Sequence, residues 1–204
     1  MPGGWPIVGW ATILLAAIIT AILAVAGTDE GGIRIVIRAT ARTSVVLFTA
    51  AFVASALRRR WPGRATRWML ANRRYLGVSF AVSHGLHLVA ILALAGWSVS
   101  RMVADAWPTA AILGGIAYLF ILAMVATSFD RTAAWLGPRA WSRLHTVGVY
   151  WIWTVFFASF APGAFTSPLY LPFALLLVAA LGMRLWQRPR VPAPITQYSP
   201  EGLS

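Results

Sequence analysis

The stretch RRYLGVSFAVSHGLHLVAILALAGW, residues 73–97, contains two histidines inside an apolar run long enough to cross a membrane. Such a crossing takes about 20 residues of helix for a hydrocarbon layer of ~30 Å. Water does not solvate an imidazole at that depth, so His84 and His87 need partners inside the protein. A third histidine, His145, lies in WSRLHTVGVYWIW, residues 141–153. The pattern raises the question of whether these rings hold a metal cofactor.

The composition is that of a membrane protein. Of the 204 residues, 59% are hydrophobic and 11% charged, with a mean hydropathy of +0.74, whereas soluble domains carry about 25% charged residues. A soluble all-α core is disfavoured because too many long apolar runs would have to be buried at once. The sequence therefore predicts an all-α, integral membrane six-helix bundle over residues 1–188, followed by a disordered cytoplasmic tail over 189–204. The predicted spans are 7–26, 44–57 (or from as early as 35), 75–97, 108–128, 140–161 and 169–186.

Charge sets the predicted orientation. All basic residues are arginine, giving a net charge of +12, and most of them follow the second, fourth and sixth spans. Since arginine gathers on the cytoplasmic side of membranes, both termini are predicted to lie in the cytoplasm, in a bacterial inner membrane. The connector after the first span is the exception, with Arg34, Arg38 and Arg42. Because the arginines flank apolar spans, they favour a topology signal over nucleic-acid binding.

Several function classes are excluded or disfavoured. The chain has no cysteine, which excludes disulfides, thiolate catalysis and iron–sulfur clusters. Its five acidic residues lie in loops, at span ends or in the tail, which disfavours a carboxylate proton relay, a paired-acid hydrolase and a small transporter. No glycine-rich phosphate loop occurs, so a quinone or flavin would have to come with a partner.

The histidines favour a haem site. The third and fifth spans run in the same direction, and His84 and His87 share one helix face because they are three positions apart. Facing helices of a bundle can clamp a cofactor between their side chains, and imidazole is a common axial ligand of haem iron. His145 would pair with His84, or with His87 if the helices are staggered. The alternative is that each histidine hydrogen-bonds to a carbonyl or hydroxyl of a neighbouring helix.

Arginines at the predicted cytoplasmic ends of these spans provide a second indication. Arg73 and Arg74 begin the third span, and Arg143 lies at the start of the fifth. Guanidinium groups at that level could pair with haem propionates. The competing interpretation is that they only orient the chain and contact lipid headgroups.

Two motifs resemble the ferric reductase-like transmembrane family, which includes the haem-binding membrane subunit of the bacterial methionine sulfoxide reductase system. They are NRRYLGVSFAVSHGLH at 72–87 and ATSFDRTAAWLGPRAWSRLHTVGVYW at 126–151, and the resemblance covers roughly residues 40–185. It implies six spans, haem b ligated by histidines, and electron transfer from a quinol or flavoprotein to a partner redox enzyme or ferric iron. The matching positions are Arg73, Arg74, Leu76, Gly77, His87, Thr127, Ser128, Leu136, Gly137, Trp141, Leu144 and His145.

The chain departs from this family at two positions. Ala158 and Ser159 stand where members carry a second histidine on the fifth helix, and Arg73 stands where larger members carry one on the third. At most one haem b is therefore expected, with membrane lipid and a redox protein as partners. The missing histidines also favour a rival hypothesis, a haem-free membrane interaction or assembly subunit derived from the same fold.

Overall fold

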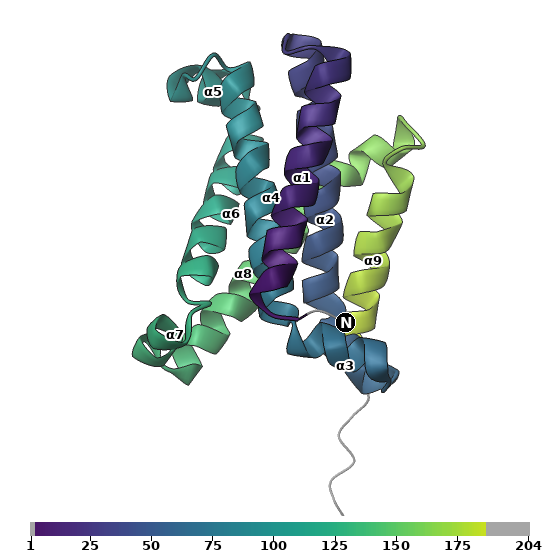
Figure 1. Cartoon of the computed structure of the whole chain (residues 1–204), viewed down its shortest axis with the longest axis vertical. Helices are drawn as coiled ribbons and strands as arrows, with labels where there is room; N and C mark the ends of the chain where they lie inside the picture. Colours follow the sequence, from purple (N-terminus) through teal and green to yellow (C-terminus); the bar gives the residue numbers. More distant parts are fainter. Residues whose placement is uncertain (1–2, 187–204) are drawn as a thin grey trace, which may run out of the picture.

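The computed structural model describes residues 3–186, and all of their regular secondary structure is helical (Figure 1). This confirms the all-α prediction, while the predicted tail at 189–204 lies outside the described residues. The elements are α1 Trp5–Ala26, α2 Glu30–Arg60, α3 Arg64–Ala71, α4 Arg73–Leu94, α5 Val99–Asp105, α6 Pro108–Ala126, α7 Asp130–Leu136, α8 Pro138–Phe160, the 3-10 helix η1 Pro162–Phe165 and α9 Leu171–Leu185.

Five helices, α1, α2, α4, α6 and α8, are long and apolar enough to cross a membrane. The sixth predicted span forms α9, which has 15 residues and a length of ~22 Å at 1.5 Å per residue. That is less than the ~30 Å hydrocarbon layer. The chain is therefore membrane-spanning by length and composition, and the number of crossings stays a prediction.

The second span differs most from its prediction. The sequence predicted a start at residue 44, or as early as 35, after a polar connector, but α2 begins at Glu30 and continues unbroken to Arg60. The side chain of Asp29 caps this helix by accepting a hydrogen bond from the Gly32 backbone N–H at 3.0 Å, and Glu30 pairs with Arg34 one turn later. A hydropathy profile detects only the apolar part of a helix, so it predicts a connector where the first turns of α2 are polar.

The turn between α1 and α2 is very tight. Gly27 ends α1 with a φ of 82°, a conformation that favours glycine. A Cβ placed on Gly32 would lie 1.9 Å from the Gly27 carbonyl oxygen. Only glycine at position 32 lets the start of α2 approach the end of α1 so closely.

Helix α2 occupies the centre of the bundle. It packs most extensively on α4 and also contacts α1, α3 and α9, while α6 packs on α8. At one end of the bundle lie α3, α7, the beginning of α1 and the end of α9 (Figure 1). We call this the arginine-rich end, because the end of α2, α3, α7 and the starts of α4 and α8 carry ten of the 17 arginines. The α1–α2 turn and α5 lie at the opposite end.

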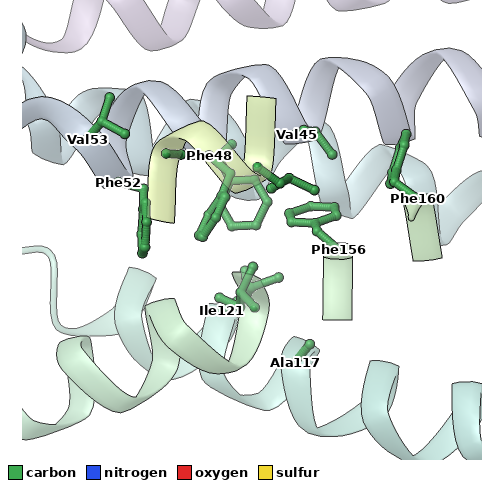
Figure 2. Close-up of a cluster of buried hydrophobic side chains, with 12 residues drawn as sticks. Val45, Phe48, Phe52, Val53, Ala117, Ile121, Phe156 and Phe160 are labelled. Carbon is green, nitrogen blue, oxygen red and sulfur yellow. The ribbon is translucent and has the colours of Figure 1, made fainter. Parts of the chain in front are cut away.

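Aromatic side chains fill the middle of the bundle (Figure 2). The Phe48 ring lies 5.4 Å from that of Phe80 on α4 and 5.5 Å from that of Phe156 on α8. Ile121 of α6 completes the same buried cluster. Since these side chains come from four helices, they fix how α2, α4, α6 and α8 are placed at this level.

Candidate functional site

His87 joins α4 to α2. Its Nδ1 lies 3.1 Å from the Ile37 carbonyl oxygen and 3.2 Å from the Thr40 Oγ1. The Thr40 hydroxyl donates to the Val36 carbonyl at 2.8 Å, so Nδ1 carries the hydrogen that both oxygens can accept. This tautomer is assigned from the hydrogen-bond network. His87 therefore makes the helix–helix contact that the sequence left open as an alternative to metal binding.

His84 lies in an aromatic environment. Its ring stacks on His87 and Tyr118, with centroid distances of 5.1 and 4.9 Å, and lies 5.4 Å from Phe156. Among residues 3–186, the buried Nδ1 of His84 has no hydrogen-bond partner. The two histidine rings are nearly parallel, with an interplanar angle of 18°, and stand on one helix. Rings arranged in this way cannot ligate one iron from opposite faces.

His145 belongs to a different cluster, near the arginine-rich end. Its ring stacks on Trp141 at 4.2 Å, and its Nε2 lies 3.2 Å from the Thr127 Oγ1. Because the Thr127 hydroxyl donates to the Ala123 carbonyl, Nε2–H of His145 donates to Thr127. Trp141 Nε1 donates to the Thr127 carbonyl at 3.0 Å. Both side chains thus tie α8 to the end of α6 and hold the imidazole in one orientation.

The structure does not bring His145 together with the histidines of α4. His84 contacts Phe156, which lies eleven residues beyond His145 on α8 and therefore ~16 Å along the helix axis. The ligating nitrogen atoms of two imidazoles on one metal ion are at most about 4 Å apart, since each metal–nitrogen bond is about 2 Å long. In the described part of the chain, no three His, Cys, Asp or Glu side chains gather as a metal-binding group.

His145 faces a cavity of about 500 Å³ near the arginine-rich end, a size typical of ligand sites. Helices α2, α3, α4, α6, α7, α8 and α9 all contribute to its walls. Apolar side chains such as Phe52 and Phe80 line much of it, and Gly77 leaves part of the α4 wall flat, because a Cβ there would meet no atom within 4 Å.

Three arginines line this cavity: Arg73, Arg74 and Arg184. Arg74 pairs with the exposed carboxylate of Asp130, and its guanidinium lowers the pKa of that carboxyl by hydrogen bonding and by charge. The positive charge of Arg73 repels that of Arg184, and Arg73 also interacts electrostatically with His145. None of the described lining residues is acidic, and the three arginines give this described lining a positive charge.

Arg184 was not among the predicted site residues. Its Nη1 donates to the Phe52 carbonyl at 3.1 Å, and its guanidinium lies 4.4 Å from the Phe52 ring centroid and 5.0 Å from that of Tyr150. In the sequence, an arginine at the end of an apolar span is typical of a topology signal. Only the packing of α9 on α2 and α8 places it at the cavity.

Arg143 is not among the residues that line the cavity, so its predicted pairing with a haem propionate stays a prediction. Its side chain is exposed, because it lies two positions before His145 and so points to nearly the opposite side of α8. Of the predicted site residues, the cavity thus gathers Arg73, Arg74 and His145, whereas His84 and His87 lie outside its lining.

A b-type haem, an apolar plane with two carboxylates, fits this cavity with one imidazole. The cavity offers His145, apolar walls, the flat surface at Gly77 and the guanidinium groups of Arg73 and Arg184. Ligation by two histidines does not fit, because His84 and His87 lie at another level of the bundle. No family model, curated protein or solved structure matches this chain, so an assignment of function depends on this geometry.

Proposed function

We propose that the protein is a membrane redox subunit that binds one b-type haem in the cavity at its arginine-rich end. The observation that carries the proposal is the combination of one oriented imidazole, His145, with two guanidinium groups, Arg73 and Arg184, around an apolar space. Bound there, the haem iron would supply one-electron transfer, which the side chains themselves cannot perform.

Each of these residues has a distinct task in the proposal. His145 would hold the haem iron through Nδ1, because its Nε2–H donates to Thr127, and Trp141 stacks on its ring. Arg73 and Arg184 would bind the haem propionates by charge-assisted hydrogen bonds. The aromatic core beyond Phe80 closes the inner end of the cavity and excludes water.

The proposed setting is the bacterial inner membrane, crossed six times with both termini in the cytoplasm. Its support is that α3, α7 and the end of α9 share one end of the bundle (Figure 1), where arginines are dense. The electron donor would be a quinol or a flavoprotein, and the acceptor a partner redox enzyme or ferric iron.

The second candidate is a haem-free membrane interaction or assembly subunit. The observation that favours it is the use of His87 as a hydrogen-bonding contact between α2 and α4, together with the absence of a second imidazole from the described cavity lining. In this case the cavity would be a remnant of the fold, and a partner protein would carry the redox chemistry.

A pyridine haemochrome assay on detergent-purified protein, expressed with excess haem precursor, separates these candidates. About one haem per chain is expected in the wild type, and little in His145→Ala. The control variants His87→Gln and His84→Phe, which preserve hydrogen bonding or ring stacking, should retain haem. Equal loss of haem in a control variant would support ligation by two histidines. A wild type without a Soret band would support the haem-free candidate.

A further inference from the structure

A row of arginines runs along α2 towards the end opposite the cavity. Arg34, Arg38 and Arg42 are four residues apart, so they follow one another along one side of the helix. Membrane proteins usually carry few arginines on the non-cytoplasmic side, and these three residues are an exception to that pattern. The redox proposal gives these arginines no role.

Their depth can be counted from the other end of α2, where Arg58, Arg59 and Arg60 end the helix. A hydrocarbon layer of ~30 Å corresponds to about 20 residues of a helix near the bilayer normal. The opposite boundary therefore falls near Arg38, with Arg42 one turn, ~6 Å, deeper. Long arginine side chains extend towards the headgroups from such positions, so both guanidinium groups can reach the phosphate level.

The three arginines differ in their partners. Arg34 is neutralised by Glu30, with an Nη2–Oε1 distance of 2.7 Å. In the described chain, neither Arg38 nor Arg42 has a carboxylate within salt-bridge distance. Of the other acidic side chains at this end, Asp29 caps the start of α2 and Asp105 ends α5, and neither forms a salt bridge with these arginines. The described part of the protein thus leaves two positive charges at the membrane boundary without an anion.

Arg42 is half-buried and held against α9. Its guanidinium carbon lies 5.9 Å from the ring centroids of both Tyr170 and Phe173. The Tyr170 ring is itself fixed, because a Cβ on Gly163 would come within 2.8 Å of it and because it packs on Phe160 at 5.7 Å. Arg42 is therefore ordered before any ligand arrives, while Arg38 is exposed one turn away.

We propose that Arg38 and Arg42 bind the phosphate of an anionic membrane lipid in the leaflet at this end of the bundle. Guanidinium groups bind phosphate oxygens through short, charge-assisted hydrogen bonds. A lipid whose headgroup carries no cation has a net negative charge, and this charge can neutralise the two arginines. This site is independent of the haem proposal, because it shares no residue with the cavity.

The test measures binding of phosphatidylglycerol to the full-length, detergent-purified protein by native mass spectrometry, with phosphatidylcholine as the reference lipid. About 1 kcal/mol for each arginine near a charged membrane surface corresponds to about fivefold weaker binding in Arg38→Gln or Arg42→Gln, and about thirtyfold in the double variant. The matched controls are Arg34→Gln, already neutralised in the same row, and Arg59→Gln at the other end; both should stay within about twofold of the wild type.

Three results would overturn the proposal. The wild type could bind both lipids equally, the double variant could keep full affinity for phosphatidylglycerol, or the loss could follow Arg59→Gln instead. The second result is expected if these arginines serve an acidic partner protein. Helicity by circular dichroism checks the fold, and Arg38→Gln alone remains decisive if the double variant is unstable, because the Arg38 side chain is exposed.

Discussion

Replacing Gly77 by leucine should fill the cavity without harming the fold. Gly77 lines the cavity, and a Cβ built on it meets no atom within 4 Å, so the new side chain begins in open space and extends into the cavity. Glycine inside a helix costs about 1 kcal/mol relative to alanine, and leucine is nearly as good a helix former as alanine. The free energy of unfolding should therefore rise by about 0.5–1 kcal/mol.

The same substitution, Gly77→Leu, should lower the affinity for haem. Leucine adds four carbon atoms to the α4 wall, and overfilling a packed site typically costs about 1–3 kcal/mol. Haem affinity should consequently fall by roughly tenfold or more. The assay combines a haem titration, followed by Soret absorbance, with thermal unfolding of the haem-free protein followed by circular dichroism.

The matched control is Gly85→Leu on the same helix. A Cβ on Gly85 also meets no atom within 4 Å, but Gly85 lies ~12 Å further along α4 and does not line the cavity. This variant should gain similar stability and keep its haem. Haem does not bind in this cavity if Gly77→Leu binds haem as well as the wild type, or if Gly85→Leu is the variant that loses haem.

Three further variants test the fold around the site. Gly32→Ala should lower the free energy of unfolding by about 1–3 kcal/mol, since its Cβ meets a backbone oxygen at 1.9 Å, whereas thermal unfolding of Gly31→Ala should match the wild type. Asn72→Ala should cost about 1–2 kcal/mol in the same assay, because the buried Asn72 Oδ1 accepts from the Gly4 backbone N–H at 2.9 Å. Arg74 lowers the pKa of Asp130, so their pair stabilises the fold above the ordinary Asp pKa near 3.9 and this contribution disappears as the pH falls through the lower folded-state value. Because Asp130 is fully exposed, solvent screens this contribution, so Asp130→Asn should lower the melting temperature at pH 7 and moderate salt only slightly; a large drop would contradict a solvent-screened pair.

The sequence predicted the apolar helices better than their polar extensions. The helices α4, α6 and α8 begin and end within a few residues of the predicted spans, because each is bounded by charged or loop-forming residues. Helix α2 was predicted too short, since its first turns combine arginines with apolar residues. The short helices α3 and α7 were expected to be loops, because a helix of one or two turns has no apolar run to reveal it.

The site was only partly predictable for a different reason. Spacing along one helix shows which side chains share a face, but the relative axial shift of two helices depends on packing across the whole bundle. Here Phe48, Phe80 and Phe156 set that shift, and His145 consequently lies at the cavity, far from His84. Arg184 could not be assigned to the site from sequence, because its role depends on where α9 packs.

Introduced cysteines can test whether the cavity at the arginine-rich end is the ligand site, since the chain contains no cysteine of its own. Ser142→Cys places a thiol in the cavity lining, and Ser100→Cys places one on an exposed position of α5 at the opposite end. The measurement is the rate at which a water-soluble maleimide labels each thiol, with and without haem. We predict that haem slows labelling of Ser142→Cys several-fold and leaves Ser100→Cys unaffected; equal rates with and without haem at Ser142→Cys would contradict the claim.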